Sequence, residues 1–188
     1  MRMVVGGARR RVATARRAGA EVLLAMARDS EFVAIRGPSG GRVRSAVVRM
    51  SATPGLDSVA YPFRHDIRVR FAETDAMGIV HHSRYLPYFE EARVAYLRHI
   101  GHPYTAWQAE GLESAVLECF VQYRLPLRFD EVVTVHTRLA KATRTTFQMT
   151  YLLTVGAEVR ATGVTVHGLI TADGRPTRLP GWLAAFVT

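Results

Sequence analysis

The strongest constraint on the fold is one helical stretch placed between a strand and four further strands. Apolar residues recur at helical spacing from Tyr85 to Ile100, whereas the stretches on either side alternate between apolar and polar side chains. Gly101 is suited to end the helix, and Pro87 fits its first turn, where backbone N–H groups lack intrahelical partners. This order predicts an α+β domain in which one long helix packs on one face of a sheet.

Five stretches of the chain alternate in the manner of half-buried strands. In the first of them, Ile67, Val69 and Phe71 share one face. The apolar faces of the other four occupy residues 115–125, 133–139, 147–155 and 164–170. Short connections between the later stretches favour hairpins, so the sheet is predicted to be antiparallel. Cys119 falls on the apolar face of its strand and is expected in the core.

The charge of the chain is unevenly distributed. Residues 1–60 hold eleven arginines against four acidic residues, so they carry +7 of the total net charge of +9. We therefore expect residues 1–60 to form a basic extension, disordered or partly helical, and residues 61–188 to form the domain. An Arg-rich start is also typical of transit peptides, whereas Met50-Ser51-Ala52-Thr53-Pro54 looks like a natural protein start, which favours a dispensable tail. Binding to nucleic acid is not expected, because this basic segment lacks interleaved aromatic residues.

The cysteine count and the hydropathy pattern limit the cellular setting. A single cysteine, Cys119, excludes an internal disulfide and a cysteine-based zinc site. No run of the sequence approaches the roughly 18 apolar residues that a transmembrane helix needs. We expect a cytoplasmic protein without a transmembrane segment.

Residues 71–85 join the first strand to the helix and bring two acids and two histidines next to the helix N-terminus. Asp75 there has the chemistry of a general base or nucleophile, and the N–H groups at the helix start could stabilise an oxyanion. The residues alone leave open that Asp75 only caps a turn and that His82 packs on the surface. Because His81 and His82 are adjacent and no compact ligand set accompanies them, no metal site is predicted.

The motif around this segment resembles the 4-hydroxybenzoyl-CoA thioesterase family, and especially the branch of Tol–Pal-associated acyl-CoA thioesterases. The resemblance covers residues 63–185 and is carried by Thr74-Asp75, Gly78-Ile79-Val80, His82, Tyr85 and Phe89-Glu90-Glu91-Ala92-Arg93. It implies a hot-dog fold, in which a five-stranded antiparallel sheet wraps around one long helix. It also implies a homodimer or homotetramer with active sites at the subunit interface. One departure is Phe71, because related enzymes often carry a tyrosine four residues before the catalytic aspartate.

The resemblance implies hydrolysis of an acyl-CoA thioester, with Asp75 and His82 as the catalytic residues and no cofactor, since coenzyme A is part of the substrate. Five further residues are candidates for substrate contact: Glu90, Glu113, Ser114, Lys141 and Arg144. Glu90 suits equally well a first-turn helix acid, and the two basic residues suit ordinary turn charges. An acyl carrier protein thioesterase and a non-catalytic acyl-binding subunit are the alternatives.

Overall fold

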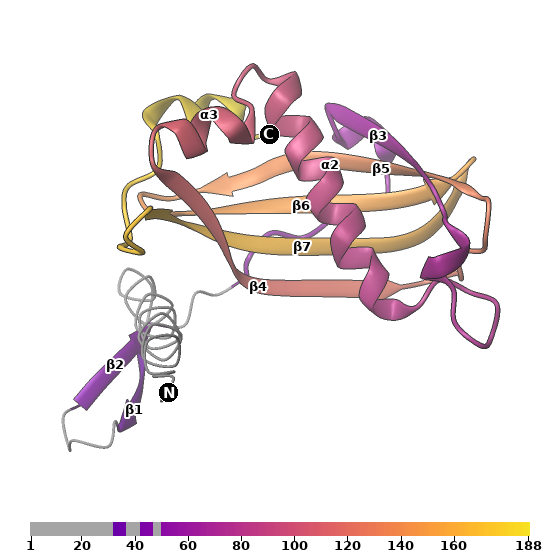
Figure 1. Cartoon of the computed structure of the whole chain (residues 1–188), viewed down its shortest axis with the longest axis horizontal. Coiled ribbons are helices and arrows are strands. Elements are labelled where there is room, and N and C mark those ends of the chain that lie inside the picture. Colours follow the sequence, from indigo (N-terminus) through magenta and orange to yellow (C-terminus); the bar gives the residue numbers. More distant parts are fainter. Residues whose placement is uncertain (1–31, 37–41, 47–49) are drawn as a thin grey trace, which may run out of the picture.

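The structure, a computed structural model, describes residues 32–36, 42–46 and 50–188. Its main element is a five-stranded antiparallel sheet in the order β3-β5-β6-β7-β4 (Figure 1). The bounds of these strands are β3 Phe63–Arg68, β4 Leu112–Tyr123, β5 Val132–Ala142, β6 Thr146–Val155 and β7 Glu158–Thr171. The helices are α2 Tyr85–His99 and α3 Tyr104–Ala109, with 3-10 turns at Ser58–Ala60, Phe71–Glu73 (η3), His82–Arg84 (η4) and Gly181–Phe186. Strands β1 Phe32–Arg36 and β2 Arg42–Ala46 pair with each other in a two-stranded sheet.

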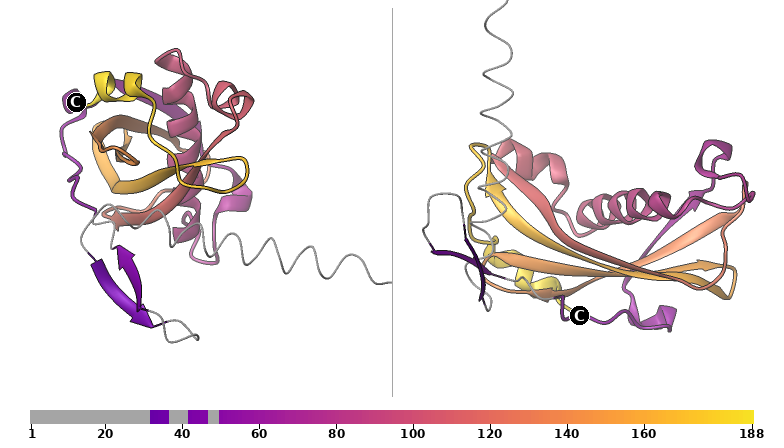
Figure 2. Two further views of the ribbon diagram at one scale, coloured as in Figure 1. Left: turned by 90° about the vertical axis from the view of Figure 1, so that its left-hand side faces the viewer. Right: turned by 90° about the horizontal axis from the view of Figure 1, so that it is seen from below.

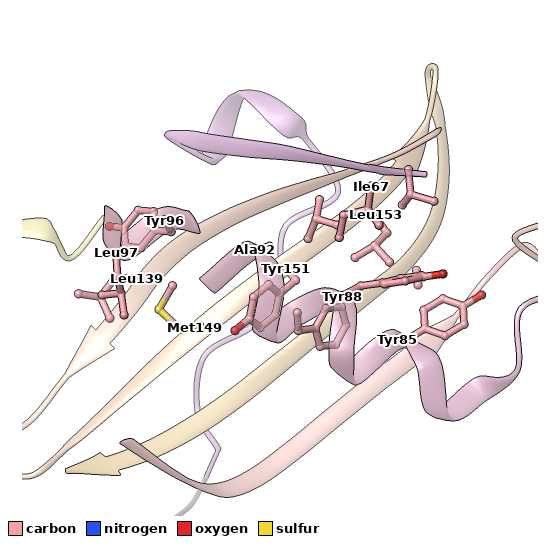
Figure 3. Close-up of a cluster of buried hydrophobic side chains, with 14 of the residues drawn as sticks. Ile67, Tyr85, Tyr88, Ala92, Tyr96, Leu97, Leu139, Met149, Tyr151 and Leu153 are labelled. Atoms are coloured by element: carbon pink, nitrogen blue, oxygen red, sulfur yellow. The ribbon is translucent and has the colours of Figure 1, made fainter. Parts of the chain in front are cut away.

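Helix α2 lies along the concave side of the curved sheet (Figure 2). Its buried face recurs at the helical spacing expected from the sequence and consists of Tyr85, Tyr88, Phe89, Ala92, Tyr96 and Leu97. These side chains pack with Met149, Tyr151 and Leu153 of β6, all at most 1% exposed (Figure 3). The helix ends at His99, and Gly101 follows with φ +82°, a left-handed conformation that suits glycine. The predicted long helix is confirmed.

The sequence pattern revealed neither strands β1 and β2, which lie in the stretch expected to be disordered or partly helical, nor helix α3. Helix α3 has six residues and buries Trp107, which is 2% exposed, against Phe147 of β6 and Trp182. So short a helix shows too few turns for a hydrophobic period to stand out. Apart from α3, the expected order of strand, long helix and four antiparallel strands is confirmed. Among the described residues, no helix is both long and apolar enough to cross a membrane.

Two expectations about core residues are wrong. Strand β3 ends at Arg68, and the chain then turns into η3, so Phe71 is 74% exposed and does not join Ile67 and Val69 in the core. Cys119 is also exposed. It lies on the edge strand β4, where a register shift between Val116 and Glu118 breaks the simple alternation that the sequence suggested.

Residues 50–61 lie against the face of the sheet opposite α2. The Gln148 side-chain oxygen accepts the N–H groups of Ser51 and Ala52 at 3.0 and 2.9 Å, and Lys141 donates to the Ser51 hydroxyl at 2.9 Å. Tyr61 is 6% exposed, and its ring lies under the Arg138 guanidinium. Among the described residues, contact with this sheet is therefore present from residue 50, ahead of the boundary predicted at residue 61, and most of the predicted extension lies outside the described residues.

Candidate active site

Asp75 lies in a tight turn at the tip of the loop between β3 and α2. Its N–H donates to the carbonyl of Ile79, and its carbonyl accepts from the N–H of Gly78, both at 2.9 Å. Gly78 has φ +71°, which glycine adopts without a Cβ clash. The Oδ1 atom of Asp75 accepts the N–H of Met77 at 2.8 Å, so the turn-capping role is present. The Oδ2 atom has no hydrogen-bond partner among the described residues, which leaves it for chemistry.

The base of this loop is held by the buried carboxylate of Glu73, which is 3% exposed. The carboxylate accepts the N–H of Arg70 at 2.8 Å, its guanidinium Nη2 at 2.6 Å and the Tyr88 hydroxyl at 2.7 Å. Burial raises the pKa of Glu73, but the hydrogen bonds from Arg70 and Tyr88 outweigh it and leave the pKa below its usual value. The Glu73 carbonyl accepts the N–H of His81 at 2.9 Å. Both ends of the loop that carries Asp75 are therefore tied together and to α2.

His82 lies in η4, which leads directly into α2, and its side chain is exposed. Its carbonyl accepts the Tyr123 hydroxyl of β4 at 3.0 Å, and its ring centroid lies 4.0 Å from that of His81. Within the described residues no hydrogen bond joins Asp75 to His82. No side chain caps the helix start at Arg84, but Pro87 has no N–H and the N–H of Arg84 donates to the carbonyl of His81 at 2.9 Å, so few backbone donors remain in the first turn of α2.

A pocket of about 320 Å³ opens between α2 and the edge of the sheet. Its main lining residues are Leu86, Phe89, Glu90 and Arg93 of α2, Val116 and Cys119 of β4, and Tyr151, Thr165 and His167 of β6 and β7. Most of this lining is apolar or aromatic, as in sites that hold small molecules. The first turns of α2 line the pocket, so it adjoins the same helix end that carries the loop of Asp75.

The floor of the pocket carries a buried group of polar side chains. The Nε2 atom of His167 lies 2.7 Å from the Thr165 hydroxyl, and its Nδ1 atom lies 3.3 Å from the Ser114 hydroxyl. The Tyr151 hydroxyl lies 2.9 Å from the same Thr165 oxygen. Burial, followed by the charge of Arg93, lowers the pKa of His167 well below its usual value, and burial raises the pKa of Tyr151 to about 12. Both groups are therefore neutral at neutral pH.

Arg93 is the cation of this pocket and is only 6% exposed. Its guanidinium carbon lies 5.7 Å from the centroid of the Tyr104 ring. Its Nη1 atom is buried and has no hydrogen-bond partner in the part of the chain that the structure describes. Glu90, one turn earlier on α2, is exposed and forms no described ion pair with Arg93. Within the described part of the chain, the buried positive charge of Arg93 is therefore not matched by an ion pair.

Three of the residues expected to contact substrate lie at or near the pocket. Glu90 lines it directly, and Ser114 lies beneath it, next to His167. Glu113 accepts the Tyr104 hydroxyl at 2.6 Å, and that hydroxyl in turn accepts the Ser114 N–H at 3.1 Å. Glu113 therefore fixes the start of β4 and the ring that covers Arg93.

Lys141 and Arg144 lie at the other end of the sheet. Strand β5 begins beside the loop that precedes α2, where Val132 pairs with Arg68. Lys141 is nine residues further along β5, about 30 Å away at 3.3 Å per residue, and Arg144 follows in the β5–β6 turn. Lys141 donates to Ser51 instead of to a group at the pocket. Within one chain, the structure does not bring these two residues to the candidate site.

The sequence analysis missed Arg93 and His167 as pocket residues. Alternation gave no signal for His167, because it shares its strand face with Thr165 and not with the apolar Val164 and Val166. Arg93 stood in the motif without a role, since a single helical arginine is usually solvated. Among the described residues, no three His, Cys, Asp or Glu side chains gather as a metal site would require.

Comparison with known proteins identifies a matching family, related sequences and similar solved structures. Residues 69–187 match the sequence profile of the thioesterase-like superfamily. A hypothetical protein of Aquifex aeolicus with a crystal structure is 38% identical, with a TM-score of 0.64 over 68% of this chain and 100% of that one. The DHNA-CoA thioesterase of Staphylococcus aureus is 31% identical, with a TM-score of 0.62 over 65% of this chain and 87% of that one. The acyl-CoA thioester hydrolase YbgC of Escherichia coli O6:H1 is 33% identical over 88 residues, which are 47% of this chain and 66% of that protein.

The sheet order around one long helix and the likeness to these solved structures confirm the expected hot-dog fold. The profile match covers more than half of the chain, and the related proteins are named as thioesterases and thioester hydrolases. The chain therefore belongs to the thioesterase-like superfamily and is a thioester hydrolase.

Proposed function

We propose that this chain is an acyl-CoA thioesterase of the 4-hydroxybenzoyl-CoA thioesterase family, close to its Tol–Pal-associated branch. It releases a free acid and coenzyme A and uses no cofactor. The observation that carries the proposal is the meeting, at the N-terminus of α2, of a loop with a partly free carboxylate and an apolar pocket. Among the relatives, the YbgC protein supports the proposal, because it is named an acyl-CoA thioester hydrolase. A cytoplasmic setting stays a prediction.

Hydrolysis requires that an oxygen nucleophile adds to the thioester carbonyl carbon and that the C–S bond then breaks. Asp75 either takes a proton from the attacking water or itself attacks to form a mixed anhydride, which water hydrolyses. Both routes need a carboxylate oxygen that is not already engaged, and Oδ2 of Asp75 meets this need among the described residues. The proton from water finally reaches the thiolate of coenzyme A or the solvent.

The negative charge that develops on the carbonyl oxygen needs donors. A backbone N–H in the first turn of α2, next to His82, is the candidate for this role, and loss of one such donor costs about 10²–10³-fold in rate. The exposed His82 ring is then available to orient Asp75 or to stabilise the leaving thiolate. The pocket between α2 and β4 takes the acyl group.

The edge strand β4 supports a homodimer. It is twelve residues long, and Val116, Phe120 and Tyr123 on it are about half exposed. A long apolar edge favours pairing with another strand, and a two-fold axis pairs β4 with β4 of a second copy in antiparallel fashion. Tyr123 contacts the catalytic loop, whereas Val116 lines the pocket. Antiparallel pairing therefore turns the loop of each subunit toward the pocket of the other. A homotetramer of two such dimers is the larger alternative.

Thiol release from a panel of acyl-CoA and acyl carrier protein thioesters tests the proposal. Both substrates present the same thioester on a phosphopantetheine arm, so only the relative rates of hydrolysis of the two substrates distinguish the two functions. The assay needs a blank with enzyme alone, because Cys119 is an exposed free thiol. We expect release from acyl-CoA. A preference for the carrier protein would instead support the acyl carrier protein thioesterase, and no release from any thioester would support a non-catalytic acyl-binding subunit.

A further inference from the structure

The unpaired charge of Arg93 is the feature of the pocket that the reaction itself does not use. Thioester hydrolysis needs a nucleophile, oxyanion donors and room for the acyl group, and none of these requires a cation deep in the acyl pocket. Arg93 is nevertheless 94% buried there, with its Nη1 atom unpartnered in the described residues. Burial of a charge without a partner is costly, so such a group is typically kept to meet an anion.

No carboxylate of the described chain pairs with Arg93: Glu113, beyond the Tyr104 ring that Arg93 contacts, instead accepts the Tyr104 hydroxyl at 2.6 Å. His167 and Tyr151 are neutral at neutral pH because burial shifts the pKa of each away from the charged form. Thr165 is a neutral hydroxyl. The acid that lines the pocket is Glu90, which is exposed and makes no described ion pair with Arg93. Because its carboxylate is exposed to solvent, Glu90 offsets the buried charge of Arg93 only weakly.

We propose that Arg93 binds a carboxylate at the far end of the acyl group, so that the preferred substrates are CoA thioesters of dicarboxylic acids. This inference rests on the proposed function. The order of residues along α2 gives the orientation: Leu86 lies nearest the helix N-terminus and the catalytic loop, and Arg93 lies about two turns further along. The thioester then sits at the loop end, the methylene chain contacts the apolar walls, and the carboxylate reaches the guanidinium. Arginine presents two parallel N–H donors that suit a carboxylate.

A carboxylate from the second subunit is the competing source of the anion. The two sources differ in what they predict. A counter-charge from the partner would make Arg93 part of the dimer interface, and its loss would weaken the dimer and affect all substrates alike. A substrate carboxylate makes Arg93 matter only for acyl groups that carry one.

The test compares adipoyl-CoA with hexanoyl-CoA, which have the same chain length and differ in the terminal carboxylate. Wild-type enzyme, Arg93→Met and Arg93→Lys are assayed by thiol release, with Arg98→Met as a matched control on the exposed face of the same helix. We expect wild-type enzyme to prefer adipoyl-CoA. Arg93→Met should lower kcat/KM for adipoyl-CoA by about 10²-fold, as loss of one partner of a buried charge pair does, and change it little for hexanoyl-CoA. Arg93→Lys should recover part of the loss, and Arg98→Met should lose nothing.

A wild-type enzyme that hydrolyses hexanoyl-CoA as well as or better than adipoyl-CoA would overturn the inference and leave the thioesterase function standing. So would an equal loss on both substrates in Arg93→Met, with or without dissociation of the dimer in size-exclusion chromatography. If Arg93→Met does not fold, the preference of the wild-type enzyme and the activity of Arg93→Lys still decide. Absence of hydrolysis of every thioester would contradict the proposed function itself.

Discussion

The hydroxyl of Tyr88 donates to Oε2 of Glu73 at 2.7 Å, and this bond connects the buried face of α2 to the base of the loop that carries Asp75. Both residues are at most 3% exposed. Arg70 donates to the same carboxylate through its main chain and guanidinium, so the buried charge is well satisfied. The position of Asp75, two residues beyond Glu73, is therefore determined by the core as well as by its own turn.

Replacement of Tyr88 by phenylalanine should lower both stability and turnover. Loss of a hydrogen bond to a buried charged group costs about 1.5–3 kcal/mol of unfolding free energy. The loop then loses its tie to α2, and kcat should fall by up to about 10²-fold while KM changes little, because misplacement of a catalytic group affects the chemical step. Tyr96→Phe is the control, since its hydroxyl bonds to the backbone of Leu139 away from the loop. If the two variants lose turnover equally, Tyr88 does not position the loop.

Asp75→Asn should abolish most of the activity and leave the fold intact. The asparagine oxygen still accepts the N–H of Met77, so the turn is retained, but the amide is neither a base nor a nucleophile. General-base catalysis contributes about 10²–10⁴-fold, and kcat should fall by that factor. Glu90→Gln is the matched comparison, because Glu90 is the carboxylate that lines the pocket. A larger loss in Glu90→Gln than in Asp75→Asn would move the catalytic role to the helix.

The free energy of unfolding should decrease as the pH drops below about 6.5, because of His167. Burial lowers its pKa in the folded protein, whereas in the unfolded chain the ring takes a proton near its usual pKa of about 6.5. The unfolded state therefore binds more protons below that pH, and the contribution of His167, complete above it, is lost as the pH falls. The slope reaches about 1.4 kcal/mol per pH unit for one proton. Urea unfolding measured between pH 7 and pH 5 gives the unfolding free energy as a function of pH. This free energy should depend less steeply on pH in His167→Gln than in the control His99→Gln, which replaces an exposed histidine. Equal slopes would contradict the assignment.

How much of the fold the sequence could predict depends on how local each signal is. The spacing from Tyr85 to Ile100 is a property of consecutive residues, so the long helix, which ends at His99, was predictable to within two residues. The expectation for Phe71 failed because alternation continues past Arg68 while the chain turns at Arg70, and no residue there enforces a strand. Alternation also says nothing of which strand lies at a sheet edge, which is why Cys119 was expected in the core.

The candidate site was predictable only where it is contiguous. Asp75 and His82 lie in one motif next to a helix start, and the structure keeps them there. Arg93 and His167 come together only because β7 pairs with β6 beneath α2, a relation that no local pattern encodes. The distance of Lys141 from the loop likewise follows from the register of β5 with β3, so its role in substrate contact stays a prediction.

Gly163→Ala should destabilise the protein by closing the space between β7 and α2. A Cβ atom at Gly163 would lie 2.3 Å from two ring carbons of Phe89, which is itself stacked on Tyr151 and only 1% exposed. Overpacking of this kind costs about 1–3 kcal/mol. Gly181→Ala, where a Cβ meets no atom within 4 Å, is the control in thermal unfolding. The added substitution Phe89→Leu should restore part of the loss; no recovery would mean that the clash is not the cause.

Removal of the N-terminal extension should be harmless up to residue 49 and costly beyond it. A chain that starts at Met50 keeps the donors of Met50, Ser51 and Ala52, which bind Glu118 and Gln148 on the outer face of the sheet. We therefore expect unchanged turnover and a nearly unchanged melting temperature. A chain that starts at residue 61 loses these bonds and uncovers the sheet, which should lower the unfolding free energy by about 1–3 kcal/mol, the sum of a few net hydrogen bonds.

Gln148→Ala in the chain that starts at Met50 should reproduce part of that loss, because its side chain accepts two of the bonds. Equal stability of the two shortened chains would show that residues 50–60 do not stabilise the domain, and a large loss of turnover on removal of residues 1–49 would make the extension part of the enzyme.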